Sequence, residues 1–294
     1  MNGFVFEGKP SDEFVMRVHH LGNGHKEAII QRQYVWEEVG PVPLIPPEIL
    51  DEVLAMRERE AEERREANRE RAARRAKTNV RRRIKAMGLD SMLTLTYREN
   101  QQDLGLVKRH MKEFVRRMRR VLGTREQPGV FSYVAAFERQ SRGAWHVHMA
   151  VHRLPKNLPW GSGVKVKSWN VVRAIWRSVV GELGGNIDES RRKSWTKRSS
   201  GKIAGYISKY MVKAFAEGDD WSNRYSASSI ELPKPIVVRF KAYALAELVA
   251  LAYDEVAGGP VECMTWLDGF GDVFFLSTEG PPGAANGEQL RLQA

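Results

Sequence analysis

Two β-rich runs joined by a short polar loop constrain the fold of this chain more than any other feature. The first run, GVFSYVAAFE, ends at Glu138, and the second, AWHVHMAVH, begins at Ala144. The residues between them, RQSRG at 139–143, form a loop of the length that joins antiparallel strands. The chain is therefore expected to contain an antiparallel β-hairpin, and with it an antiparallel sheet.

The segments around the hairpin alternate between strand and helix patterns. Apolar residues alternate with threonine in MLTLTY at 92–97, which predicts a strand, whereas 106–122 and SWNVVRAIWRSVV at 168–180 place apolar residues at helical spacing. A short strand, GGNID, and a further helix, GKIAGYISKYMVKAF, follow. The order β-α-β-β-α-β-α predicts an α+β fold: a ferredoxin-like (split βαβ, RRM-like) antiparallel sheet with helices on one face.

Changes in composition predict five segments along the chain. Residues 1–50 contain many turn formers and end in GPVPLIPPEIL, whose prolines disfavour a regular element, so an extended arm or linker is expected there. The other predicted segments are a charged basic helix at 51–88, a catalytic-sized domain at 89–230, a C-terminal α/β extension at 231–278 and a disordered tail at 279–294.

The formal charge of +11 is concentrated rather than spread evenly. Residues 57–85 contain 13 basic and 6 acidic side chains, which indicates either a solvated helix held by i,i+4 pairs or a helix that contacts phosphates. A polyanionic partner is expected, with nucleic acid ahead of a membrane surface. The chain shows no secretory signal and no apolar run long enough to span a membrane, and its single cysteine fits a reducing compartment, so a soluble cytoplasmic protein is expected.

The hairpin contains a candidate metal site. Side chains two residues apart on a strand share a face, so His146 and His148 are expected side by side, about 7 Å apart at Cα. A hairpin closed by residues 139–143 brings Glu138 to the same face, diagonal to His146. Two imidazoles and one carboxylate form a three-ligand site with open positions, which is typical of catalytic rather than structural metals. His152 has the same parity but lies farther along, and it is interpreted as a structural or edge residue.

A second candidate site lies on the helix that contains YISKYMVK. On a helical wheel Tyr206, Tyr210, Lys209 and Lys213 share one arc, opposite the apolar side of the helix. A phenol is a poor nucleophile at neutral pH unless positive charge or a metal-activated electrophile lies nearby, and the lysines supply such charge. The alternative is that the tyrosine rings only cover the edge of the core.

Two groups of cations are candidates for binding a DNA backbone, because they line helix faces in the basic parts of the chain. The residues are Lys108, Arg109, Lys112, Arg116, Arg119 and Arg120 in the helix at 106–122, and Arg81, Arg82 and Arg83 in the charged helix.

HVH with Glu138, followed by YISKYMVK, resembles the HUH endonucleases, specifically the rolling-circle replication initiators of plasmids and single-stranded DNA phages. LTLTY at 93–97 lies where the first motif of that family is expected, and the likeness extends over residues 90 to 217. The paired tyrosines are more similar to the two-tyrosine phage type than to single-tyrosine initiators.

The resemblance implies a metal-dependent nickase and strand transferase. Glu138, His146 and His148 are then the ligands of Mg²⁺ or Mn²⁺, and Tyr206 or Tyr210 attacks the DNA to leave a 5′-phosphotyrosyl link and a free 3′-OH. Lys209 and Lys213 stabilise charge at the phosphate or position the strand. The implied partners are single-stranded DNA at a replication origin, a host helicase and a host DNA polymerase, in the cytoplasm of a bacterial cell.

Two other classes of function remain open from the residues. Two histidines and a carboxylate also describe the site of a non-haem iron oxygenase, although such a protein has a β-rich barrel and no use for the tyrosines. A ferredoxin-like module that binds single-stranded nucleic acid without metal, by stacking bases on aromatic side chains, has the same fold and no catalysis.

Overall fold

The computed structural model describes residues 4–42, 45–124, 126–160, 164–189, 200–216, 225–257 and 263–278. The chain divides into two units: the first comprises 1–71 and 233–284, and the second comprises 72–232 and 285–294. The helix α1 (Leu50–Ala86) begins in the first unit and ends in the second.

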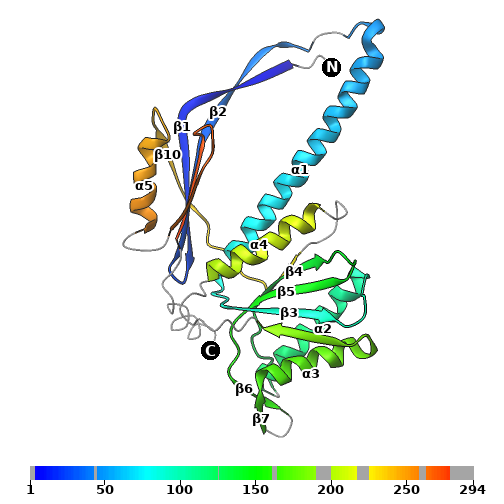
Figure 1. Ribbon diagram of the computed structural model, residues 1–294. Helices are drawn as coiled ribbons and strands as arrows, with labels where there is room; N and C mark the ends of the chain where they lie inside the picture. Colours follow the sequence, from blue (N-terminus) through cyan, green and yellow to red (C-terminus); the bar gives the residue numbers. More distant parts are fainter. Residues whose placement is uncertain are drawn as a thin grey trace. The chain divides into compact units, whose positions relative to one another are not determined.

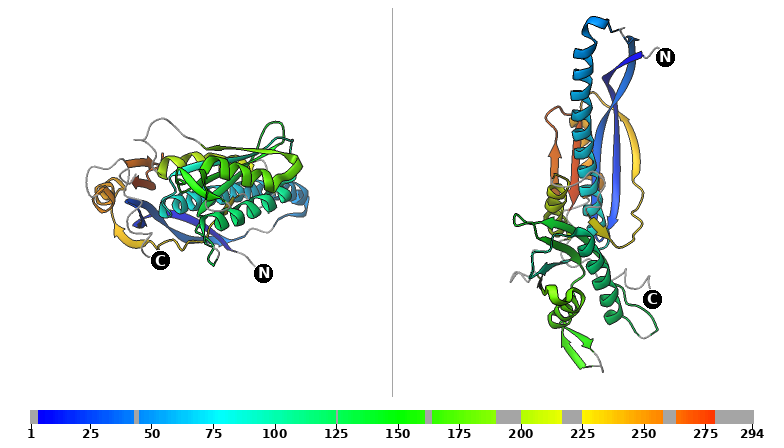
Figure 2. Two further views of the ribbon diagram at one scale, coloured as in Figure 1. Left: turned by 90° about the horizontal axis from the view of Figure 1, so that it is seen from below. Right: turned by 90° about the vertical axis from the view of Figure 1, so that its right-hand side faces the viewer.

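The first unit contains a five-stranded antiparallel sheet in the order β10-β1-β2-β12-β11 (Figures 1 and 2). Its elements are β1 (Phe4–Gly22), β2 (His25–Pro41), the short helix η1 (Pro47–Ile49), β10 (Ile236–Lys241), α5 (Ala246–Ala257), β11 (Cys263–Leu267) and β12 (Val273–Thr278). The helix α5 covers one face of the sheet, where Phe14, Ile30 and Leu276 are buried against Leu248 and Ala252. The two N-terminal strands and the three strands of the C-terminal extension are thus parts of one sheet.

This sheet corrects the expectation of an extended arm at 1–50. The prolines do mark an irregular connection, since β2 ends at Pro41 and the next helix starts at Pro47, but the residues before Pro41 form two long paired strands. The register of the pair shifts at Val5/Phe6 and again at Pro10/Phe14. The first shift adds one residue to β2 and reverses the faces of that strand, whereas the second adds two residues to β1, so the regular period-two pattern that reveals a strand is interrupted in the sequence.

The second unit is built on another five-stranded antiparallel sheet, in the order β8-β3-β5-β4-β9 (Figure 1). Its elements are β3 (Ser91–Tyr97), α2 (Leu104–Leu122), β4 (Tyr133–Arg139), β5 (Trp145–Val151), the hairpin of β6 (Asn157–Trp160) and β7 (Val164–Lys167), α3 (Ser168–Val180), η2 (Gly181–Leu183), β8 (Gly185–Glu189), α4 (Ser200–Ala216) and β9 (Tyr225–Ala227). The predicted order of strands and helices is present from β3 to α4, with the β6–β7 hairpin, which was not predicted, inserted between β5 and α3.

One face of this sheet is covered by α2 and α3. Their apolar stripes, including Phe114, Met118 and Trp176, pack on the odd-numbered side chains of the central strands, such as Leu95 and Val147. The start of α2 is fixed by its N-cap, because the Asp103 carboxylate accepts a hydrogen bond from the backbone N–H of Leu106, at 3.1 Å.

The other face is covered by α4 and the end of α1, and this differs from the expected placement of all helices on one face. Ile203, Ala204 and Ile207 of α4 pack with Val80 and Ile84 of α1 on the even-numbered side chains of β4 and β5. Helical periodicity shows which side of a helix is apolar, but it does not show which face of a sheet receives that side. The two helical layers therefore place α4, with its tyrosines, on the face of the sheet opposite α2.

Candidate metal and tyrosine site

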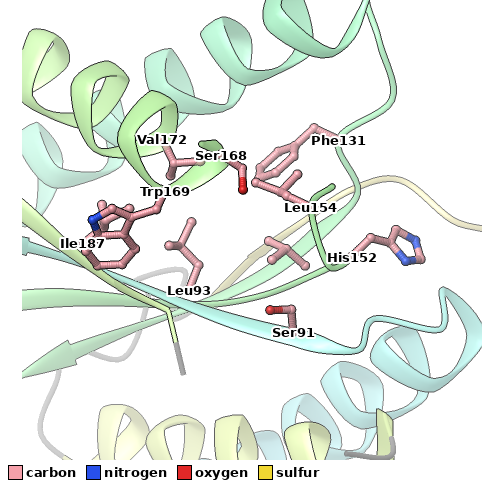
Figure 3. A pocket seen from close by; sticks show the side chains of 10 residues that line it. Ser91, Leu93, Phe131, His152, Leu154, Ser168, Trp169, Val172 and Ile187 are labelled. Atoms are coloured by element: carbon pink, nitrogen blue, oxygen red, sulfur yellow. The ribbon is translucent and has the colours of Figure 1, made fainter. Parts of the chain in front are cut away.

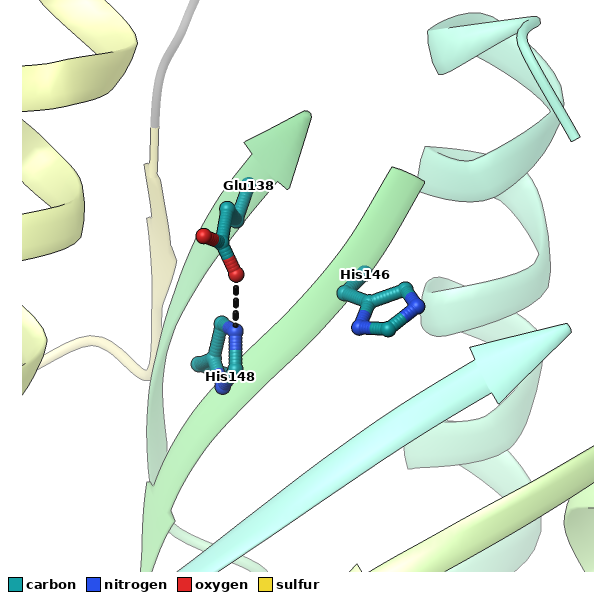
Figure 4. A group of neighbouring side chains, drawn as sticks. All are labelled: Glu138, His146 and His148. Atoms are coloured by element: carbon teal, nitrogen blue, oxygen red, sulfur yellow. Dashed lines mark hydrogen bonds and ion pairs between the residues drawn. The ribbon is translucent and has the colours of Figure 1, made fainter. Parts of the chain in front are cut away.

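The three candidate ligands come from the hairpin of β4 and β5 and point to one side of it (Figure 4). Glu138 pairs directly with His146 across the two strands, and His148 lies two residues farther along β5. The expected diagonal placement of Glu138 is corrected, because the pairing continues to Arg139 and Trp145 and leaves residues 140–144 as the loop. The strand residue opposite Glu138 is therefore His146 rather than the expected Ala144, two positions farther along β5. Because side chains alternate between the two faces of a strand, a change of two positions leaves the Glu138 carboxylate on the expected face.

The geometry of the cluster suits a divalent cation. One ligand atom from each of Glu138, His146 and His148 lies within 4.8 Å of the other two. His148 Nε2–H donates to Glu138 Oε2 at 2.7 Å, whereas the buried Nε2 of His146 has no hydrogen-bond partner among the described residues. A buried polar atom without a partner costs free energy, and a bound cation would remove that cost. Imidazole nitrogen with carboxylate oxygen is a donor set for a first-row divalent metal.

Both imidazoles are in the protonation state that binds metals. Burial lowers the pKa of His146, with the neighbouring His148 lowering it further and Glu138 opposing the shift. Burial also lowers the pKa of His148, against the hydrogen bond and charge of Glu138. Since a histidine ordinarily titrates near 6.5, both rings are neutral at physiological pH.

Two residues that the sequence reasoning did not single out hold the far nitrogens of these rings. Thr94 Oγ1 lies 3.2 Å from His148 Nδ1, and Gln140 Nε2 lies 3.2 Å from His146 Nδ1. The amide nitrogen of Gln140 donates to His146 Nδ1, whereas the Thr94 hydroxyl can donate to or accept from His148 Nδ1. For Thr94 the signal was present in the sequence, because its parity in LTLTY places it on the face of the sheet that carries the histidines.

The tyrosines of α4 lie directly over His148. The ring of Tyr210 is stacked on the His148 imidazole, with centroids 4.1 Å apart and planes inclined by 9°, and the ring of Tyr206 stands edge-on at 6.4 Å. The helix is held in this place by the burial of Ile203, Ala204 and Ile207 on its opposite side. The structure therefore brings together two predicted sites that are more than 50 residues apart in the sequence.

The two phenols differ in environment. Tyr210 is half-buried, and its hydroxyl donates to the hydroxyl oxygen of Tyr206 at 2.5 Å, while the side chain of Tyr206 is 41% exposed. Burial raises the pKa of Tyr210, and the hydrogen bond to Tyr206 raises it further.

Lys209 is exposed on the same helix, and Lys213 lies in α4 with its side chain outside the described part of the chain.

The cations proposed for DNA lie elsewhere. The predicted residues of α2 are in the helical layer that covers the opposite face of the sheet from the metal cluster. At the end of α1, Arg81, Arg82 and Arg83 are half-buried, and Arg83 donates to the carbonyl oxygen of Ser228 at 3.3 Å. Part of the charge at the end of α1 is thus used within the protein.

A small apolar hollow near His152 is not part of the site. It is lined mainly by residues such as Leu93, Phe131 and Val172 beneath α3, with the imidazole of His152 at its margin (Figure 3). Its lining is the core of the α2 and α3 side of the sheet, which agrees with a structural role for His152.

Comparison with known proteins identifies one segment. Residues 90–215 match the family model of the replication-associated protein ORF2. The match runs from the start of β3 to the last turn of α4, and so it includes the metal cluster and both tyrosines. The predicted resemblance to replication initiators is confirmed for this segment. No curated protein and no solved structure matches the chain.

None of the helices in the described part of the chain combines the length and apolar character needed to cross a membrane.

Proposed function

We propose, from the match of residues 90–215 to replication-associated proteins, that this chain initiates rolling-circle DNA replication as a metal-dependent, site-specific single-strand endonuclease and strand transferase. The observation that carries the proposal is the stacking of Tyr210 on His148, which joins a candidate nucleophile pair to a candidate metal site. Neither the family match nor the cluster alone specifies the reaction.

Glu138, His146 and His148 would hold the cation, with Thr94 and Gln140 orienting the two imidazoles. A bound Mg²⁺ or Mn²⁺ supplies a Lewis acid that polarises the scissile phosphate and draws charge from its oxygens.

The tyrosine forms the covalent link in the proposed reaction. The hydroxyl oxygen of Tyr206 attacks the phosphorus, the bond between phosphorus and the 3′ oxygen breaks, and the tyrosine proton is balanced by the proton taken up at the new 3′-OH. The product is a 5′-phosphotyrosyl link that conserves the phosphodiester, and the free 3′-OH can be extended by a host polymerase. Tyr210 can cut the regenerated origin in a second transfer, while Lys209 and Lys213 stabilise charge at the phosphate or position the strand.

The fold supports this proposal. A split βαβ, ferredoxin-like sheet is supported by the order β3-α2-β4-β5-α3-β8, apart from the β6–β7 hairpin, and by the strand arrangement β8-β3-β5-β4. We propose that origin DNA enters single-stranded over the face that carries the histidines. A host helicase is the expected source of unwinding, in the bacterial cytoplasm.

The site favours this function over the two alternatives. A non-haem iron oxygenase gains nothing from a phenol stacked on a metal ligand, and its sheet is a barrel rather than an open sheet flanked by helices. A non-catalytic nucleic-acid module could stack bases on Tyr206, which is exposed, but it does not require a carboxylate between two neutral imidazoles.

A denaturing gel tests the proposal. The full chain is incubated with Mn²⁺ and labelled single-stranded fragments that tile the DNA element encoding it. The expected result is one fragment cut and attached to protein, with the adduct lost after chelation, in His146→Ala and in the double variant Tyr206→Phe with Tyr210→Phe.

The matched control is the double variant Tyr243→Phe with Tyr253→Phe, two tyrosines at least 39% exposed in the first unit, which should form the adduct as the wild type does. Adduct formation by the α4 double variant would reject the nucleophile. Failure to cut any fragment, by a wild-type protein that is folded by circular dichroism, would reject the enzyme.

A further inference from the structure

A basic groove follows α2 on the side of the molecule's second unit that faces away from the metal cluster. It has a volume of about 810 Å³, and its cations are Arg109, Lys112, Arg116, Arg119 and Arg120. Two carboxylates, Glu113 and Glu126, also line it. The groove is therefore rich in positive charge, and it is separate from the tyrosines.

The wall opposite the helix is a fixed turn. The backbone N–H of Gly129 donates to the carbonyl oxygen of Arg119 at 2.7 Å, and that of Thr124 donates to the carbonyl oxygen of Gln127 at 2.8 Å. A Cβ on Gly123 would come within 2.2 Å of the Gln127 carbonyl oxygen, so only glycine allows the two ends of the turn to meet. The groove is thus defined by backbone contacts as well as by side chains.

The carboxylate of Glu113 offsets only part of this charge, because it is paired with Arg116 and Arg117. Glu113 accepts hydrogen bonds from Arg116 and Arg117 at 2.6 to 2.7 Å, and these bonds lower its pKa to about 2. The side chains of Lys112, Arg119 and Arg120 are exposed and form no ion pair with any described residue. Three cations therefore remain available to an anionic ligand.

The spacing of these three cations fits a row of phosphates. Lys112 and Arg120 are separated by eight residues, or about 12 Å along the helix axis. One strand of a DNA duplex presents about three phosphates over that length.

The groove lacks the surface that binds unpaired bases. Proteins that bind single strands stack bases on exposed aromatic rings, but Tyr133, an aromatic residue of the lining, is only 9% exposed and its hydroxyl lies 3.0 Å from Ser226 Oγ. A basic surface without a stacking ring contacts the backbone and ignores the bases. The ligand chemistry is that of a sugar-phosphate backbone whose bases are already paired.

We propose that the α2 groove binds double-stranded DNA, as an anchor for a duplex segment distinct from the single strand at Tyr206. The helical layer of α2 and the sheet itself lie between the groove and the histidines, so one short strand does not occupy both. That the duplex flanks a replication origin rests on the proposed function; the binding itself does not.

The test measures binding without catalysis. The full chain carrying Tyr206→Phe and Tyr210→Phe, with chelator present, is titrated by fluorescence anisotropy against an arbitrary 20-base-pair duplex and against a 20-nucleotide oligothymidine strand. Adding Lys112→Ala, Arg119→Ala and Arg120→Ala should weaken duplex binding about 10-fold or more at 0.1 M salt. The same change should lower the slope of log affinity against log salt by about 2 to 3.

The matched control removes three exposed lysines from the β6–β7 region, Lys156→Ala, Lys165→Ala and Lys167→Ala, and should leave the duplex affinity within about twofold of the parent. An equal loss of oligothymidine binding in the groove variant would show a track for single strands and overturn the proposal. Equal duplex affinity of the groove and control variants, or no duplex binding by the parent, would overturn it as well. A failure of DNA cleavage by the wild type rejects the nickase and leaves this result standing.

Discussion

Tyr210 lies flat on His148, with ring centroids 4.1 Å apart and an angle of 9° between the planes, while its hydroxyl donates to Tyr206. The stack fixes Tyr210 against a metal-ligand candidate and leaves Tyr206 as the more exposed phenol. A donated hydrogen bond also stabilises negative charge on the Tyr206 oxygen. The arrangement favours Tyr206 as the first nucleophile and Tyr210 as its positioning partner.

The single tyrosine variants should therefore differ. Tyr206→Phe should abolish the first covalent adduct, because no hydroxyl remains at that position. Tyr210→Phe keeps the stacked ring and loses one hydrogen bond to a developing charge, so the rate of adduct formation should fall about 10-fold or more without disappearing. Single-turnover kinetics on the cleaved fragment gives both rates, and the reverse order of severity would assign the first attack to Tyr210.

Thr94 supports the metal site from the neighbouring strand. Thr94→Val removes the hydroxyl next to His148 Nδ1 and keeps a β-branched side chain, so the affinity for Mn²⁺ measured by calorimetry should fall about 10-fold. The matched control is Thr96→Val on the same strand, since the Thr96 hydroxyl donates to the Asn186 carbonyl oxygen rather than to a histidine nitrogen. Equal losses in the two variants would indicate damage to β3 rather than a role in orienting the ring.

The lowered pKa of both histidines sets the pH dependence of metal binding. Protons compete with metal only below the pKa of the free site, so the Mn²⁺ affinity should stay constant from pH 8 to about 6.5 and fall at lower pH. Without metal, the unfolded chain binds more protons than the folded chain just below pH 6.5, so the free energy of unfolding should decrease there as the pH falls. A loss of affinity that already begins between pH 8 and 7 would contradict neutral, buried imidazoles.

Much of the second unit could be predicted from its sequence because its strands are short and regular. The parity of His146 and His148 follows from the period of a strand whatever the loop length, so a register that differed from the expected one still left Glu138 on the right face. The parity of LTLTY gives the face of Thr94, but its place beside His148 depends on β3 pairing with β5. The place of Gln140 beside His146 depends on the conformation of the hairpin loop.

The first unit was harder to predict for a physical reason. Its sheet joins β1 and β2 to β10, β11 and β12, which are about 200 residues away in the sequence, and no local pattern specifies such pairs. Shifts of register at Pro10/Phe14 and elsewhere also hide the alternation within β1. The prolines mark the end of β2, but they carry no information about the residues before them, which form paired strands.

Two glycines of the second unit should respond in opposite ways to alanine, in thermal or urea unfolding of the full chain. A Cβ on Gly185 would lie 2.6 Å from Nε1 of Trp176, a buried indole that donates to the Thr96 carbonyl oxygen at 2.8 Å. Gly185→Ala should therefore lower the free energy of unfolding by about 1 to 3 kcal/mol, because the backbone and the ring must move apart.

Gly205 is an exposed residue inside α4 with nothing within 4 Å of its Cβ position, so Gly205→Ala should raise the free energy of unfolding by about 1 kcal/mol through helix propensity. If Gly185→Ala were neutral, the close packing of β8 on Trp176 would be wrong, and if Gly205→Ala were destabilising, α4 would not be an ordinary helix at the residue before Tyr206.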